Sequence, residues 1–352
     1  MKQICKPIKS YLLLWSTQSL SALGSSMTGY ALGLWLYQST GSALKASLLT
    51  VCSYAPYVLM SILAGALRSF SQSMITLLTP VLATMLFTLG GVSTVIIADL
   101  ASFAVAFTAL LFIRIPEPHN SGKESESFFR SVKSGLSWLK ANPLILKLIF
   151  FLSGINLIAS ANNAALTPLI LSKTYNNKSV LSAVYFFIGA ATFAGSFIAS
   201  YTSAPRNRVK AICLSLFISM STENFILAFS DSPILWCIGV VLGWLFIPFM
   251  GANLDVVFRS TIPAEMQGRV YACRNTMQFF TIPIGSLSSG ALIDNCFEPF
   301  MSRQNGESVL CTVFGTGKGS GAALLMAVLG AAGVAVCVIF SLLLKHEKYD
   351  NG

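Results

Sequence analysis

Four acidic residues fall inside or beside long apolar stretches of this sequence: Asp99, Glu223, Asp255 and Asp294. A carboxylate is costly to place in an apolar environment, so such residues are candidates for proton transfer or ion pairing. Glu223 lies 13 residues beyond Lys210, about 20 Å along a helix that rises about 1.5 Å per residue. Glu223 is therefore a candidate for proton coupling. The alternative is a structural role, with its carboxylate hydrogen-bonded to Asn224 or another polar neighbour.

The other three acidic residues have simpler interpretations. Asp255 precedes Arg259 by four residues, a spacing that lets the two pair on one helix face as a gate or helix-end ion pair. Asp99 is expected to begin a helix, where a negative charge favours the N-terminus. Asp294 is expected to be a solvated helix end.

The remaining polar motifs argue against an enzyme. The run FGTGKGSG has Lys318 followed by Gly319, so it lacks the Ser or Thr of a phosphate-binding loop, and no strand precedes it. His119 and His346 have no partner at catalytic or metal-ligand spacing, and the eight cysteines form no C-x-x-C pair. Cys296 and Cys311 flank one expected loop, but the expectation is that they stay unpaired. We therefore predict no catalytic residue, no metal, no nucleotide and no cofactor.

The composition determines which elements must position these residues. Only 10% of the 352 residues are charged, 54% are apolar, and the mean hydropathy is +0.71, whereas a soluble domain has about 25% charged residues. Apolar runs of about 20 residues match the thickness of a bilayer. The sequence therefore predicts an all-α polytopic membrane protein. We expect ten spans: 11–37, 47–67, 69–90, 92–113, 144–172, 180–203, 209–230, 233–258, 275–296 and 320–344.

The basic residues predict the orientation of these spans. With a cytoplasmic N-terminus, 18 of the 23 Lys and Arg residues lie on the inner side, as the positive-inside bias requires. The five expected on the outer side are Lys45, Lys173, Lys178, Arg303 and Lys318. Both termini are then cytoplasmic. The net charge of +10 is explained by a lipid bilayer as partner, without nucleic acid.

A polar interior segment divides the chain into three parts. Residues 1–113 hold four spans, residues 114–143 form a cytoplasmic linker, and residues 144–352 hold six spans. The linker begins with IPEPHNSGKESES, whose Pro, Ser and Glu content predicts a flexible chain. The following stretch SFFRSVKSGLSWLK gathers its large apolar residues on one face, which predicts a helix lying on the inner leaflet.

The two sets of spans form an incomplete internal repeat. Spans 1 and 2 align with spans 5 and 6, the span that begins at 69 with the one that begins at 275, and span 4 with span 10. The spans at 209–230 and 233–258 have no counterpart in the first half. We therefore predict that the first half has lost two spans near residues 66–68.

The stretch from Ile262 to Phe300 carries the strongest motifs. A polar turn with the order P-x-E-x-x-G-R (Pro263 to Arg269) precedes a span rich in small residues, and D-x-x-F-E-P (Asp294 to Pro299) follows it. This order resembles the major facilitator superfamily, in its branch of macrolide-efflux-like drug exporters. The basic G-x-x-x-D-R-x-x-R/K turn that the family carries after its second span is absent here.

The resemblance implies a two-bundle fold with about 10 transmembrane helices, four plus six, that rocks around a site near the middle of the membrane. It also implies export of small molecules driven by protons, without ATP. Polar and aromatic residues within the spans supply the expected substrate cavity: Gln18, Asn156, Asn163, Trp244, Asn253, Gln278 and Phe279. The expected cytoplasmic gate consists of Arg206, Arg208, Asp255, Arg259, Glu265, Gly268 and Arg269. Helix bending is expected at Pro80, Pro283, Gly285 and Gly290.

Two functions from different classes follow. The first is a proton-coupled exporter of small amphipathic compounds or drugs in the bacterial inner membrane. The second is an internally deleted membrane protein of the same family that inserts but does not transport.

Overall fold

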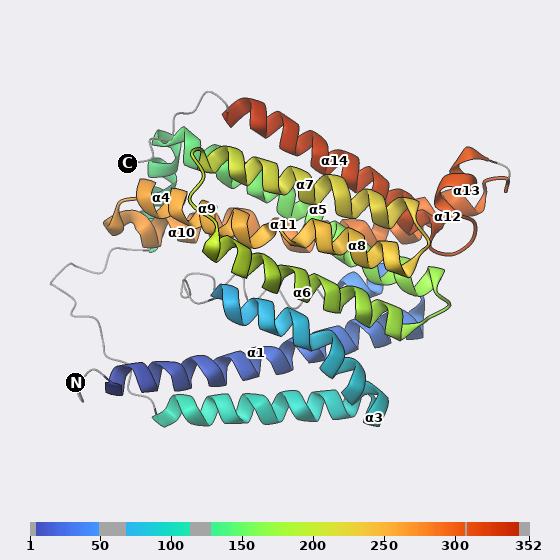
Figure 1. The fold of residues 1–352 in the computed structure, drawn as a ribbon, viewed down its shortest axis with the longest axis horizontal. Helices are drawn as coiled ribbons and strands as arrows, with labels where there is room; N and C mark the ends of the chain where they lie inside the picture. The colour runs from blue at the N-terminus through green and yellow to red at the C-terminus, as the bar shows by residue number, and fades with distance from the viewer. Residues whose placement is uncertain (1–4, 49–67, 113–127, 307, 345–352) are drawn as a thin grey trace.

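The computed structural model describes residues 5–48, 68–112, 128–306 and 308–344, and helices make up most of this part of the chain (Figure 1). The described residues contain no strand. The helices are α1 (Cys5–Thr40), α3 (Arg68–Phe112), α4 (Phe128–Ala141), α5 (Pro143–Lys173), α6 (Lys178–Tyr201), α7 (Arg208–Phe229), α8 (Pro233–Trp244), α9 (Ile247–Thr261), α10 (Ala264–Phe279), α11 (Thr281–Leu292), η1 (Ile293–Phe297, a π-helix), α12 (Glu298–Ser302), α13 (Val309–Phe314) and α14 (Ser320–Leu344). The expected span 47–67 and the flexible part of the linker lie mainly outside the described residues.

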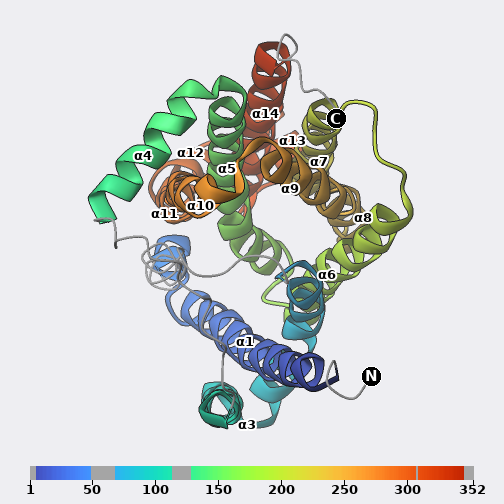
Figure 2. The same cartoon turned by 90° about the vertical axis from the view of Figure 1, so that its left-hand side faces the viewer.

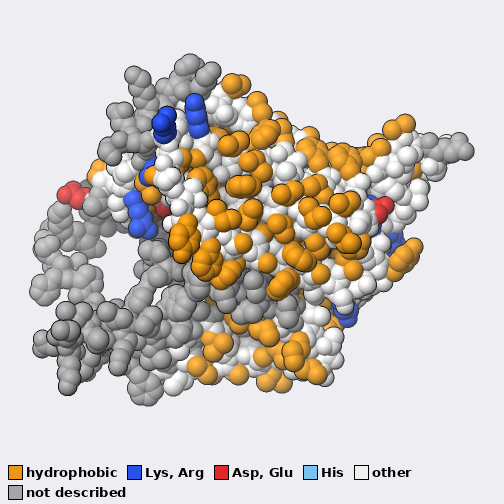
Figure 3. Space-filling model, viewed as in Figure 1, with side chains coloured by type: hydrophobic (Ala, Val, Ile, Leu, Met, Phe, Trp, Pro, Cys, Tyr) orange, Lys and Arg blue, Asp and Glu red, His pale blue; other side chains and the backbone are white. Residues whose placement is uncertain are grey.

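Among the described residues, six stretches are long and apolar enough, by length and composition, to cross a membrane: Leu82–Val105, Pro143–Lys173, Lys178–Tyr201, Arg208–Phe229, Pro233–Thr261 and Ser320–Leu344. The first of these contains the bend of α3 at Gly90 and Gly91. On the face shown in Figure 3, apolar side chains cover the middle, and Lys and Arg gather mainly toward the end where α1 begins. We call this the proximal end, and the opposite end, where α1 finishes and α6 starts, the distal end. The protein is an all-α polytopic membrane protein, as predicted.

α3 is a hairpin of two apolar segments. Its backbone leaves the helical region at Gly90 and Gly91, and Gly91 has a φ of 69°, which a residue without a Cβ adopts at little cost. The bend therefore lies at this glycine pair, at the boundary expected between two spans. Pro80, expected to bend this helix, lies within the first segment.

Asp99 does not begin a helix, contrary to the prediction from the sequence. Asp99 lies inside the second segment of α3, eight residues past Gly91, and not at the start of a helix. Its carboxylate accepts hydrogen bonds from Thr28 Oγ1 (2.9 Å) and Ser25 Oγ (3.3 Å) of α1. Asp99 therefore joins the two helices of the first bundle instead of capping one of them.

The helices form two groups. α1 packs on α3, while α5 to α14 form the larger group, in which α5 contacts α11 and α14, and α7 contacts α14 and α8. α3 also packs on α6 and joins the groups, as the view from the proximal end shows (Figure 2). The core of the larger group contains the fully buried side chains of Trp236, Phe151 and Phe258.

The second segment of α3 exposes an apolar face that includes Ile97, Leu100 and Phe103, at 66%, 62% and 58% of their surface. In the larger group α7 covers α14, which is the expected repeat partner of this segment. Among the described residues, the first bundle has no helix in the place of α7. The loss of two spans near residues 66–68 remains a prediction, because residues 49–67 lie outside the described part of the chain.

The polar stretch expected as a turn after Pro263 is instead the helix α10, with Pro263 as its N-cap residue. The local sequence AEMQGRVYACRN after Pro263 contains no proline and several good helix formers, so the helix runs through Gly268 to Phe279. α4, expected as an interfacial helix, packs against α10. Arg269 Nη1 of α10 donates a hydrogen bond to Ser134 Oγ of α4 (3.3 Å).

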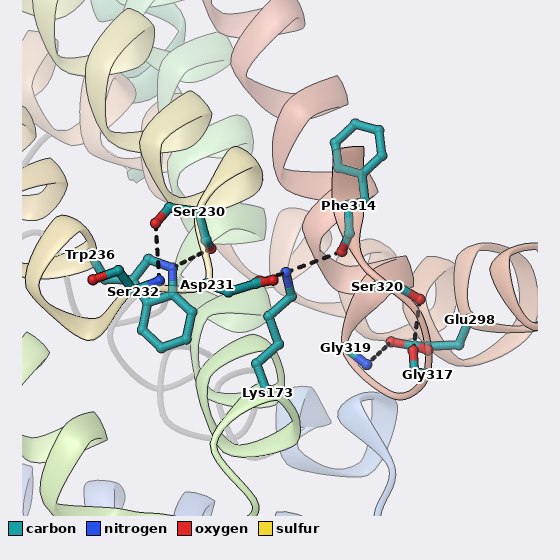
Figure 4. Close-up of polar contacts among 10 residues, drawn as sticks. All are labelled: Lys173, Ser230, Asp231, Ser232, Trp236, Glu298, Phe314, Gly317, Gly319 and Ser320. Carbon is teal, nitrogen blue, oxygen red and sulfur yellow. Dashed lines mark hydrogen bonds and ion pairs between the residues drawn. The ribbon is translucent and has the colours of Figure 1, made fainter. Parts of the chain in front are cut away.

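Two acidic groups organise the distal end of the larger group (Figure 4). Lys173 Nζ pairs with the Asp231 carboxylate and donates a hydrogen bond to the Phe314 carbonyl (3.1 Å). Glu298 Oε1 accepts hydrogen bonds from the backbone N–H groups of Gly319 (2.9 Å) and Ala322 (3.4 Å). Glu298 thereby caps α14. Burial raises the pKa of the Glu298 carboxyl, although these amides favour its charged form.

Candidate functional site

A cavity of about 150 Å³ lies between the two groups of helices. α1 contributes Gly29 and Gly33 at one helical turn's spacing, and the larger group contributes Asn163 of α5. The other residues that line it are Tyr30, Leu34, Ala46, Ser47, Ala164, Thr167, Pro168, Leu181 and Tyr185. The walls are mostly apolar and carry a few hydroxyl and amide groups, as small-molecule sites usually do.

Hydroxyl groups join the two groups of helices beside this cavity. Ser182 Oγ of α6 lies 2.6 Å from Thr84 Oγ1 of α3 and 3.3 Å from the Tyr30 hydroxyl of α1. Tyr30 and Tyr185 meet edge to face, with ring centroids 5.4 Å apart. Tyr185 in turn lies 3.3 Å, oxygen to oxygen, from Thr167. The cavity is therefore framed by a polar contact that crosses from one bundle to the other.

Glu223 is a buried carboxylate within the larger group, with 3% of its surface exposed. Its Oε1 accepts hydrogen bonds from Trp244 Nε1 (3.1 Å) and Asn162 Nδ2 (3.4 Å). Three helices, α5, α7 and α8, therefore meet at this carboxylate. Asn224, the partner suggested for Glu223, instead donates its side-chain amide to the Met220 carbonyl (3.1 Å) on its own helix.

The structure brings one of the seven predicted cavity residues, Asn163, to the cavity. Gln18 lies in α1, but its side chain lies outside the described residues. Asn156 donates to the Gln278 carbonyl (3.3 Å), and the Gln278 side chain accepts from Arg274 (3.1 Å). Phe279 is half-buried at the end of α10.

The other two predicted cavity residues bind neighbouring side chains. The Trp244 indole binds Glu223. Asn253 Oδ1 accepts a hydrogen bond from Arg208 Nη1 (2.9 Å).

Sequence reasoning missed Tyr30, Tyr185 and the two glycines of α1. The available signal was the concentration of small residues in the first span, which was interpreted as helix packing. The register of these residues against α5 and α6 depends on contacts more than 100 residues apart, so the local pattern could not reveal it.

The predicted gate residues lie at the proximal end of the larger group. Arg208 binds Asn253 of α9, and Arg269 binds Ser134 of α4. Asp255 and Arg259, predicted to pair with each other, both act electrostatically on Tyr271 of α10. Arg206 and Glu265 are exposed, and a Cβ built at Gly268 has no atom within 4 Å.

Pro283, Gly285 and Gly290 were predicted to bend the helix, and the two glycines lie at close contacts between helices. α10 and α11 meet at Phe280, three residues before Pro283, and the backbone there keeps a helical conformation with φ −60° and ψ −28°. Gly285 packs directly against the Leu157 carbonyl and Ser160 Oγ of α5. Gly290 packs against Ala43, Leu44 and Ser47 of the first bundle. Both glycines therefore allow close helix contact.

Two groups of membrane helices around a shared cavity define the class of two-bundle membrane transporters. Comparison with known proteins identifies the family. The sequence profile of the Major Facilitator Superfamily matches residues 66–286, more than half of the chain. The chain belongs to this superfamily, whose members bind and transport small molecules.

Named relatives are distant. Macrolide efflux protein A of Streptococcus pyogenes, and the same protein of its serotype M6 strain, are 21% identical over 245 residues, 68% of this chain and 60% of the relative. The match thus spans less than two thirds of the length of these relatives. A crystal structure of the nucleoside transporter NupG (D323A mutant) matches with a TM-score of 0.52 and 13% identity, covering 95% of this chain and 90% of that one. This second similarity concerns the fold alone.

Proposed function

We propose that the chain exports small amphipathic compounds from the cytoplasm of a bacterial cell, by alternating access in its inner membrane and in exchange for protons. The observation that carries this proposal is the cavity between the two bundles. The efflux function of the similar S. pyogenes protein supports the direction of transport.

The lining of the cavity favours a substrate with both apolar and polar parts. The aromatic faces of Tyr30 and Tyr185 offer apolar contact, and the Asn163 amide and Thr167 hydroxyl offer hydrogen bonds. No Asp, Glu, Lys or Arg occurs among the described residues that line it. A neutral or weakly charged amphipathic compound fits these groups best.

Glu223 is the proposed proton-carrying residue. It lies next to the cavity wall, because its partner Asn162 precedes the cavity-lining Asn163 and because Tyr185 is its electrostatic neighbour. A buried carboxylate that exchanges one proton could change its bonds to α5 and α8 and so connect protonation to helix movement.

Gly33→Phe is the first test of this site. Gly33 lines the cavity, and no atom lies within 4 Å of a Cβ built there, so we expect the added ring to occupy cavity space. We expect a fluorescent amphipathic dye to accumulate, in efflux-deficient cells that express the variant, to the level of cells without the protein. The membrane content of the protein should not change.

Val328→Phe on α14 provides the matched control, because Val328 is 46% exposed on the outside of the bundle. This variant should export dye as the unsubstituted protein does. Normal export by Gly33→Phe would mean that the substrate does not pass through this cavity.

A further inference from the structure

Asp294 connects the two bundles at the distal end. One carboxylate oxygen, Oδ2, accepts hydrogen bonds from Ser42 Oγ (2.5 Å) and the Leu44 backbone N–H (3.0 Å). The other, Oδ1, accepts from the Ala43 backbone N–H (3.1 Å). Sequence reasoning treated Asp294 as a solvated end, yet its three donors belong to the chain about 250 residues earlier, in the opposite bundle.

The local backbone positions Asp294 for these contacts. It lies in η1, the π-helical turn between α11 and α12, and such turns often occur at functional sites. One helical turn earlier, a Cβ on Gly290 would lie 2.6 Å from Leu44 Cα and 2.8 Å from the Ala43 carbonyl oxygen. The absence of a side chain at Gly290 therefore lets the backbones approach closely enough for the carboxylate to reach its donors.

Other contacts between the bundles occur toward the same end. The Tyr37 hydroxyl of α1 lies 2.9 Å from Ser172 Oγ of α5, and Lys178 of α6 lies over the Phe87 ring of α3, 4.6 Å from its centroid. Among the described contacts of this end, only Asp294 brings a carboxylate to the opposite bundle. Hydrogen bonds to a charged acceptor are stronger than those between neutral groups.

We propose that Asp294 is a positioning residue for transport, a latch that holds the distal mouth between the bundles closed. When the carboxylate releases Ser42, Ala43 and Leu44, the distal ends separate and the cavity opens on that side. With the orientation expected from the basic residues, the distal mouth faces the outside of the cell. The role of this latch in export rests on the proposed function. Opening of the distal mouth, however, can be measured without any substrate.

Glu298 offers a matched comparison four residues further along the same motif. Its carboxylate also accepts backbone N–H groups, but those of Gly319 and Ala322 lie within the larger bundle. Loss of charge at Glu298 therefore weakens a cap inside one bundle and leaves the contact between bundles in place.

Distances between spin labels at Gln38 and Arg303 test the latch. Arg303 is exposed and Gln38 is half-buried; both lie near the distal end, one on each bundle. The full chain, with its eight native cysteines replaced, carries cysteine-linked labels at these two positions in lipid nanodiscs. We expect Asp294→Asn to add a longer distance and to raise the open-to-closed ratio about tenfold, as the loss of one charged hydrogen bond implies. Glu298→Gln should keep the distance distribution of the parent protein.

Ser42→Ala is the second variant. It removes one donor but leaves the carboxylate and both backbone N–H groups, so we expect a smaller shift in the same direction. An unchanged distribution in folded Asp294→Asn, or an equal shift in Glu298→Gln, would overturn the proposal. If the parent protein exports no dye and Asp294→Asn still opens the distal mouth, the latch stands and the proposed function fails.

Discussion

Glu223→Gln is expected to abolish the uncoupler-sensitive part of efflux while leaving a folded protein in the membrane. Glutamine has nearly the same shape, and its carbonyl oxygen can still accept the hydrogen bonds that Trp244 and Asn162 donate to Oε1. It cannot release or take up a proton. The variant therefore removes proton exchange and keeps the packing between α5, α7 and α8.

The measurement is dye accumulation in cells, with and without an uncoupler, at matched levels of membrane protein. Asp231→Asn is the control, because Asp231 is a carboxylate with 68% of its side chain exposed at the distal end. This control should retain uncoupler-sensitive efflux. If Glu223→Gln also retains uncoupler-sensitive efflux, Glu223 has the structural role that the sequence also allowed.

Glu223→Leu separates the structural role from the chemical one. This substitution leaves the Trp244 and Asn162 donors buried without their acceptor, which costs roughly 1–3 kcal/mol for an unsatisfied group. We expect a lower melting temperature in detergent for Glu223→Leu than for Glu223→Gln. Equal melting temperatures would mean that the two hydrogen bonds contribute little to stability.

Gly285→Val is expected to have the largest effect on folding. A Cβ at this position meets the Leu157 carbonyl and Ser160 Oγ, so α11 must move away from α5. Because the carbonyl belongs to the helix backbone, the obstacle cannot rotate away. Overpacking of this kind costs about 1–3 kcal/mol or more, and we expect a clear fall in melting temperature and in the yield of folded protein.

Gly251→Val is the matched control for this substitution. No atom lies within 4 Å of a Cβ built at Gly251, and its helix propensity changes in the same way. The difference in melting temperature between the two variants therefore measures the helix contact. A difference near zero would contradict the close packing of α11 on α5.

The sequence predicted the elements that depend on local pattern. The amphipathic pattern after the linker predicted α4, and the boundary between spans at residues 90–92 coincides with the bend at Gly91. The long apolar runs predicted α5, α6, α7 and α14, because twenty apolar residues have few alternatives to a membrane helix.

The partners of polar side chains were not predictable in the same way. Asp294 binds residues of the other bundle, and Asp99 binds α1 across more than 70 positions of the chain. Such pairs depend on the register between helices. A single sequence does not reveal which positions of two helices face each other. For the same reason, Asn163 alone lines the cavity among the predicted cavity residues whose side chains are described.

The prediction of a turn after Pro263 was wrong for a local reason. The Glu, Gln, Arg and Asn residues of this stretch look like a loop in an apolar chain, but these residue types other than Asn are good helix formers. The helix α10 lies at the proximal end against α4, where its polar residues find hydrogen-bond partners.

The central claim is that this chain transports despite the spans expected to be missing from its first bundle. Its most direct test is dye accumulation in efflux-deficient cells that express this chain alone, with and without an uncoupler. We expect the chain to lower accumulation and the uncoupler to restore it. Accumulation equal to that of cells without the protein, with the chain present and folded in the membrane, would contradict transport and favour an inactive, internally deleted family member.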